Sequence, residues 1–103
     1  MAVNQGGAKI LWADVSADFA SVTSASGLDS SAIALTGASP GDPVWVGDTL
    51  QSTANSAQSG IVFTGYVAAA DSVKIRAHNY TAANVDPTSR SFKVAVIKLL
   101  DLP

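Results

Sequence analysis

The chain contains no cysteine and no glutamate, and it carries little charge of either sign. Without cysteine, neither a disulfide framework nor a thiolate metal site can form, so packing must stabilise the fold. All eight acidic residues are aspartates, and aspartate favours turns and caps whereas glutamate favours helices. Charged residues make up 14% of the sequence, against a usual share of about 25%. The composition therefore argues against extended surface helices.

This low charge content, combined with 48% hydrophobic residues, leaves two explanations open. Either part of the surface meets another subunit or a larger assembly, or the excess is alanine, which is small and tolerated at most positions. We favour the first explanation. The 103 residues fit one domain, and a domain of this size buries about 60–70% of its unfolded surface. Association would stabilise such a domain further and would cover its sheet edges.

The sequence also lacks the features of several functional classes. Its formal net charge of −2 offers no basic field for nucleic acid or for an anionic membrane. Residues 1–7 lack the charged start and the apolar run of a signal peptide. No apolar run approaches the roughly 20 residues of a membrane-spanning helix. We therefore expect a soluble product made in the cytoplasm, with neither nucleic acid nor membrane as a partner.

The second half of the chain carries the clearest structural signal. Residues 60–67 and 72–79 are rich in β-branched and aromatic side chains and are separated by only four residues. A third such run, at 91–100, follows a segment of turn formers. This spacing is typical of an antiparallel meander. Both faces of 60–67 are fairly apolar, so we predict that this strand is covered on two sides.

Alternation assigns the faces of the next two strands. In the first of them, Val73, Ile75 and Ala77 are expected to point into the core, whereas Lys74, Arg76 and His78 are expected to point outward. In the last strand one face carries Phe92, Val94 and Val96, and the other carries Lys93, Ala95 and Ile97.

The first half adds short segments of the same character. They are an apolar run at 9–12 and strands at 15–20, 31–36 and 44–46. Turn formers or polar residues predict connections at 24–29, 37–43 and 48–59, the last of which is long for a compact domain. Together these patterns predict an all-β fold, a single antiparallel β-sandwich or jelly-roll-like domain of about six to eight short strands with very little helix. The domain is expected to span residues 9–103, after a flexible N-terminal arm at residues 1–8.

The sequence offers no recognisable catalytic constellation. His78 is the only imidazole, and alternation places it beside Arg76 on a polar strand face, as expected of a surface histidine. Neither a Gly-x-Ser-x-Gly elbow nor a nucleotide-binding glycine motif is present. We therefore predict that the protein is not an enzyme, has no catalytic residues and uses no cofactor or small-molecule substrate.

Two further motifs have simpler explanations than chemistry. The pairs Asp14 with Asp18 and Asp42 with Asp48 flank strands but match no calcium loop, so turn formation explains them and no metal site is predicted. The glycosylation sequon that begins at Asn79 is interpreted as chance, because no secretion signal precedes it.

The aromatic side chains allow three interpretations. Trp12, Trp45, Tyr66 and Tyr80 suit core packing, a subunit interface or a sugar-stacking platform. Alternation sets Trp45 opposite its neighbouring valines, so its ring either packs between sheets or is presented outward.

Four segments carry a family resemblance. They are residues 41–46 (GDPVWV), 60–76 (GIVFTGYVAAADSVKIR), 79–87 (NYTAANVDP) and 92–98 (FKVAVIK). Their turns and strand patterns resemble a family of small all-β phage virion proteins, the decoration or cement proteins that stabilise heads, and related domains of phage fibres. The chain differs from that family in the long polar segment 48–59, where members are shorter and contain proline.

The resemblance implies a homotrimer on the outer capsid surface of the virion, made in the host cytoplasm, that clamps the major capsid protein. Residues 1–9 and 99–103 are then the expected contact segments. The alternative is a receptor- or glycan-binding β-domain of a phage tail fibre, in which Trp45 and the loop 48–59 would form the binding platform.

Overall fold

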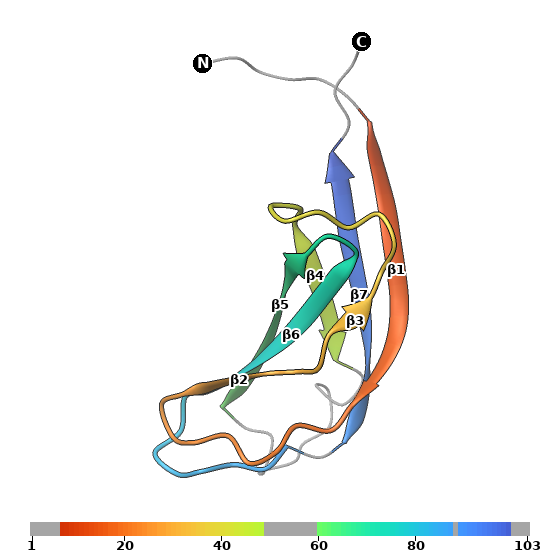
Figure 1. Ribbon diagram of the computed structural model, residues 1–103. Helices are drawn as coiled ribbons and strands as arrows, with labels where there is room; N and C mark the ends of the chain where they lie inside the picture. The colour runs from red at the N-terminus through yellow and green to blue at the C-terminus, as the bar shows by residue number, and fades with distance from the viewer. Residues whose placement is uncertain (1–6, 49–59, 88, 100–103) are drawn as a thin grey trace, which may run out of the picture.

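The computed structural model describes residues 7–48, 60–87 and 89–99, and these residues form strands, turns and no helix (Figure 1). The strands are β1 (Ala8–Ala17), β2 (Gly27–Asp29), β3 (Ile33–Ala34), β4 (Val44–Asp48), β5 (Ile61–Ala69), β6 (Ser72–Asn79) and β7 (Arg90–Leu99). The predicted all-β class is confirmed. Within the described ranges no helix suited to crossing a membrane is found.

The strands form two antiparallel sheets. In the first sheet β7 lies between β1 and β4, and in the second β6 pairs with β5 on one side and with β2 and β3 on the other. The inner faces of the two sheets pack against each other around one hydrophobic core. This two-layer arrangement is the predicted sandwich.

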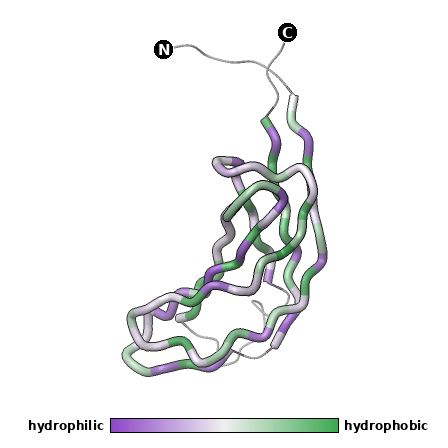
Figure 2. The backbone as a smooth tube through the Cα atoms, in the orientation of Figure 1, coloured by the Kyte–Doolittle hydropathy of each residue, from purple (hydrophilic) through white to green (hydrophobic). Residues whose placement is uncertain are grey.

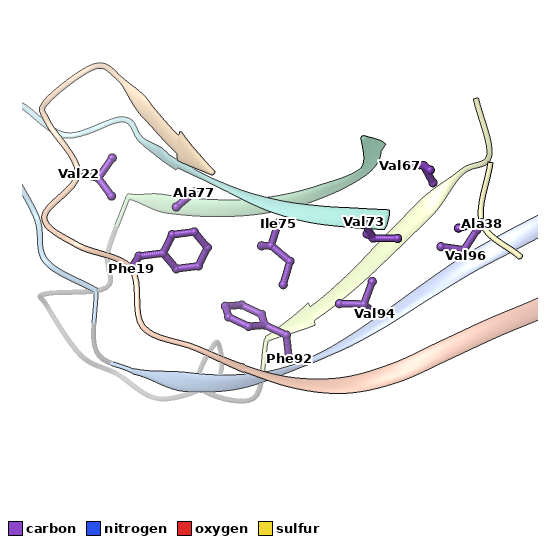
Figure 3. Close-up of a cluster of buried hydrophobic side chains, with 10 residues drawn as sticks. All are labelled: Phe19, Val22, Ala38, Val67, Val73, Ile75, Ala77, Phe92, Val94 and Val96. Atoms are coloured by element: carbon purple, nitrogen blue, oxygen red, sulfur yellow. The ribbon is translucent and has the colours of Figure 1, made fainter. Parts of the chain in front are cut away.

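The core lies between β6 and β7, the strands with neighbours on both sides. The three side chains predicted to point inward from β6 are fully buried, and so are the three predicted to share one face of β7: Val73, Ile75, Ala77, Phe92, Val94 and Val96. Figure 3 shows how these side chains from both sheets interdigitate with Phe19 and Val22. The rings of Phe63 and Phe92 meet edge-on, with centroids 4.9 Å apart, a favoured aromatic geometry.

A buried ion pair lies at one end of this core. Arg90 is the first residue of β7, and its Nη1 donates to Oδ2 of Asp48 at 2.8 Å, with both side chains almost fully buried. The Arg90 guanidinium also lies over the ring of Phe63, 5.1 Å from its centroid. Removal of either charged partner would leave a buried charge, which is strongly destabilising.

At the opposite end, β1 and β7 continue past the rest of the molecule as a two-stranded ribbon (Figure 1). β4 pairs with β7 only as far as Val96, whereas β1 follows β7 to the pair Ala8–Leu99. In Figure 2 this ribbon carries hydrophobic residues on both strands. The strand thus begins at the last residue of the predicted arm; residues 1–6 lie outside the described ranges.

Three predictions for the first half were wrong in type or extent. Residues 9–12 and 15–17 belong to one continuous strand, β1, because β7 supplies a partner for each residue from Ala8 to Ala17, and residues 18–20 lie beyond its end. The predicted loop at 24–29 contains β2, because Gly27 to Asp29 pair with His78 to Arg76 of β6. Glycine suits this strand since the Arg76 side chain lies where a Cβ at Gly27 would be. The strand expected at 31–36 is confined to β3.

The turn at 37–43 is confirmed. Gly37 and Gly41 have φ angles of 99° and 97°, and the backbone N–H of Asp42 donates to the carbonyl of Ser39. Positive φ is a conformation that glycine adopts without a steric penalty. β4 then runs two residues further than predicted, so Asp48 belongs to a strand rather than to a loop, and residues 49–59 lie outside the described ranges.

The hairpin between β5 and β6 is tighter than predicted. β5 extends to Ala69, which pairs with Ser72, and Asp71 turns the chain with a φ of 61°. The predicted coverage of β5 on both faces is wrong, because Val62 and Tyr66 are exposed while the alternate residues face the core. β6 occupies the predicted range.

Candidate functional site

An apolar strip covers the outer face of the first sheet. Directly paired residues of antiparallel strands point to the same face, and the pairs Ala8–Leu99, Ile10–Ile97 and Trp12–Ala95 therefore line up along the β1–β7 ribbon. β4 adds Trp45, which also pairs with Ala95. We call these residues the outer strip: Ala8, Ile10, Trp12, Trp45, Ala95, Ile97 and Leu99. Ile97 is itself buried, whereas Ile10, both tryptophans and Leu99 are exposed.

Two tryptophans dominate the outer strip. Trp12 is 62% exposed and Trp45 is 66% exposed, so both rings face solvent. They lie on either side of Ala95, two strand spacings apart, or about 10 Å. Because the side chain of Ala95 is short, the surface between the two large rings is lower than the rings themselves. Such a profile accepts an aromatic or aliphatic side chain of a partner between the rings, and buried tryptophans are frequent anchors of protein interfaces.

The strip ends at a polar row. Asp14 and Lys93 are paired residues on β1 and β7, and Nζ of Lys93 donates to Oδ1 of Asp14 at 2.9 Å. The same ammonium lies 5.5 Å from the centroid of the Trp12 ring. This cation–π contact restrains the Trp12 ring beside the ion pair. The apolar part of the face is thus bordered by charge at one end and continues along the ribbon at the other.

The outer face of the second sheet has the opposite character. Oδ1 of Asp29 accepts from Nη1 of Arg76 at 2.9 Å, and its Oδ2 accepts from the hydroxyl of Tyr66 at 2.6 Å. The Tyr66 hydrogen bond and then the Arg76 contact lower the pKa of Asp29, because both stabilise the carboxylate. The same hydrogen bond raises the pKa of Tyr66, since the phenol donates to an anion.

The structure divides into two groups the four aromatic residues whose role the sequence left open. Trp12 and Trp45 come together on the outer strip, so packing between the sheets is wrong for Trp45. Tyr66 belongs to β5 of the other sheet, and Tyr80 directly follows β6 of that sheet, 70% exposed beside the ring of His78. The register of β7 with both β1 and β4 creates the tryptophan pair. No local sequence signal indicates that pairing.

The sequence attributed two pairs of aspartates to turns and predicted no metal site, but Asp14 and Asp48 lie in strands β1 and β4, so turn formation is wrong for these two. Asp14 and Asp48 pair with Lys93 and Arg90 respectively, and Asp42 accepts from Nζ of Lys98 at 2.9 Å. The Lys98 contact, followed by the Ser39 backbone N–H, lowers the pKa of Asp42. Among the residues that the structure describes, no group of three or more metal-ligating side chains is found.

The sequon residue has a structural role. Asn79 is 1% exposed, and its side-chain nitrogen donates to the carbonyls of Val22 and Ala83 at 2.9 and 2.8 Å. Its Oδ1 accepts from both the N–H and the hydroxyl of Thr81. These bonds use the full capacity of the amide, so the side chain is occupied in the folded chain. His78, on the predicted polar face of β6, stacks on Tyr80 with ring centroids 5.9 Å apart.

Comparison with known proteins gives no match: no family model, curated protein or solved structure is significantly similar to this chain. The resemblance to phage decoration proteins therefore stays a prediction from the sequence motifs. The outer strip is consequently the principal functional candidate, and its chemistry is suited to binding another protein surface.

Proposed function

We propose that this chain is a non-enzymatic capsid decoration protein of a phage, which binds the outer surface of the head as a homotrimer and stabilises the coat lattice. The observation that carries the docking part of the proposal is the outer strip, with two exposed tryptophans beside an apolar ribbon. Soluble monomers seldom leave a contiguous apolar patch of this kind uncovered, and such patches mark interaction sites. The capsid as partner rests on the family resemblance of residues 41–46, 60–76, 79–87 and 92–98.

The proposed mechanism is mechanical. Each copy buries the outer strip against the major capsid protein, and the Ala8–Leu99 end of the ribbon extends this contact beyond the sandwich. Trimerisation adds avidity, because the second and third contacts become intramolecular once the first has formed. A lattice held in this way resists internal pressure, since several weak contacts must fail together.

A binding experiment tests the proposal. Purified protein is mixed with undecorated heads and, separately, with host cells, and each sample is pelleted. Cosedimentation with heads, lost in Trp45→Ala, is the expected result. Light scattering should give a mass near three times 10.4 kDa. A stable monomer at micromolar concentration that does not pellet with heads contradicts the proposal.

A second candidate function is a receptor- or glycan-binding domain of a phage tail fibre. The observation that favours it is the same pair of solvent-facing rings, Trp12 and Trp45, since exposed aromatic rings also stack on sugars. Residues 49–59 of the expected platform lie outside the described ranges. Pelleting with host cells but not with heads would favour this function.

A further inference from the structure

A second surface feature lies on the opposite sheet from the outer strip. It is a shallow groove where β2 pairs with the end of β6, next to the turn that precedes β2. Its lining residues are Ala25, Ser26, Gly27, Arg76, His78, Asn79 and Tyr80. None of these residues belongs to the outer strip, so the groove requires a separate explanation.

Two stacked rings form one wall of the groove. The rings of His78 and Tyr80 are 22° from parallel with centroids 5.9 Å apart, and Tyr80 remains 70% exposed. Opposite His78 on the neighbouring strand is Gly27, and the Arg76 guanidinium lies over it in the place of a side chain. The groove therefore presents a flat aromatic surface next to a guanidinium.

The segment that carries Tyr80 is rigidly held. The backbone N–H of Tyr80 donates to the carbonyl of Gly60 at 2.9 Å, and the side chain of the preceding residue, Asn79, makes the four hydrogen bonds described above. The hydroxyl of Ser24 donates to the carbonyl of Thr81 at 2.7 Å, which ties the turn before β2 to the same segment. Both sides of the groove are thus fixed before any ligand arrives, which lowers the entropy cost of binding.

A guanidinium occupies the other end of the groove. Asp29 holds Nη1 of Arg76, and the rest of the guanidinium lies across Gly27, where a Cβ would be 2.6 Å from Nη2. Lys74 lies next along the outer face of β6 and contributes to the electrostatic field at Asp29. This face therefore combines two cations with one carboxylate, in a chain whose formal net charge is −2.

We propose that this groove binds an acidic saccharide, a pyranose ring that bears a carboxylate, such as a hexuronate unit of a glycan. The apolar face of the sugar ring lies on Tyr80, and the carboxylate accepts hydrogen bonds from Arg76, whose planar fork matches a carboxylate. A nucleic acid is a poorer fit, because it needs a track of phosphate contacts and successive stacking rings. The inference goes beyond the capsid-binding proposal, because it concerns the other face of the molecule.

The test is an amide-resolved NMR titration of the full chain with trigalacturonate, with its methyl ester and with 5′-AMP. We expect trigalacturonate to shift the amide signals of Gly27, His78 and Tyr80. The neutral ester should bind about 10- to 100-fold more weakly, the equivalent of a lost charged hydrogen bond. The proposal is overturned if these signals do not move at about 10 mM ligand, where a millimolar binder is largely saturated. It is equally overturned if ester and acid bind alike, or if 5′-AMP binds as tightly.

Three variants distinguish binding at the groove from binding elsewhere on the protein. Tyr80→Ala should weaken trigalacturonate binding about five- to tenfold through loss of stacking. Gly27→Ala keeps every charge but displaces the Arg76 guanidinium, so it should also weaken binding of the acid while leaving binding of the ester unchanged. Trp45→Ala, on the outer strip, is the matched control and should bind trigalacturonate like the parent chain. Unchanged binding in both groove variants contradicts the proposal, whatever Trp45→Ala does to capsid binding.

Discussion

The outer face of the first sheet presents Trp12 and Trp45 to solvent, whereas the outer face of the second sheet presents Lys74, Arg76 and His78. Both faces lie over the same core, and both are produced by period-two alternation. On β6 the outward positions are polar, as expected for a face in water. On β1 and β4 they include large apolar side chains that remain exposed among the residues that the structure describes. The contrast supports the proposal that the first face is the one that another protein covers.

The largest expected effect comes from the core that both faces share. Phe92→Ala removes a fully buried ring that contacts Phe19 and Phe63, and it should lower the free energy of unfolding by about 3–5 kcal/mol. Chemical denaturation measures the change. Trp45→Ala is the control, and its exposed ring should contribute little to stability. If Trp45→Ala proved as destabilising as Phe92→Ala, the outer strip would be part of the folding core rather than a binding surface.

The next effect tests the apolar face alone. Trp12→Ala combined with Trp45→Ala should weaken binding to undecorated heads by about 1,000-fold, because anchor residues of interfaces contribute about 2 kcal/mol or more each. The fold should be retained, as judged by circular dichroism. Tyr80→Ala, on the other sheet, should leave head binding unchanged. Loss of head binding in Tyr80→Ala with retention in the double variant would reverse the assignment of the two faces.

A smaller effect on stability is expected when the inner and outer faces of β4 are compared. A Cβ added at Gly65 would lie 2.6 Å from Cγ1 of Val44 and 2.8 Å from Cγ2 of Val46, so Gly65→Ala must separate β5 from β4. We expect a loss of about 1–3 kcal/mol in thermal or chemical unfolding. Gly47→Ala is the control, because its Cβ would make only ordinary contacts, at 3.8 Å, with Lys93. Equal stability of the two variants would show that the sheets are not packed this closely.

The smallest effect concerns the polar face and its pH dependence. The folded-state pKa of Asp29 is lowered by Tyr66 and Arg76, so its stabilising contribution is complete above the unfolded-state pKa, near 4. That contribution is lost as the pH falls through the lower folded-state value. Asp29→Asn should therefore reduce stability at neutral pH by less than about 1 kcal/mol, since the pair is partly exposed.

Denaturation at neutral pH and near pH 3 measures this difference. The difference in the free energy of unfolding between Asp29→Asn and the parent chain should become smaller on acidification. Tyr66→Phe should reproduce part of this effect. If that difference in the free energy of unfolding became larger at low pH, the folded protein would not favour the ionised form of Asp29.

Much of the fold could be predicted from local patterns. Alternation along 72–79 correctly assigned Val73, Ile75 and Ala77 to the core, because a strand side chain has only two faces available. The turn at 37–43 was predictable because glycine accepts the positive φ that reversal requires. β2 was not predictable, since Gly27 favours strands poorly and is paired here by β6.

The sequence by itself determined which residues of each strand share a face, and that the chain would form sheets rather than helices. Only the tertiary structure decided which strands are neighbours, and therefore that Trp12 and Trp45 flank Ala95 on one surface while Tyr80 stacks on His78 on another. The physical reason is that side-chain direction is set by the local backbone. Strand order depends instead on hydrogen bonds and core contacts between segments far apart in the chain, whose free energy no local pattern reports.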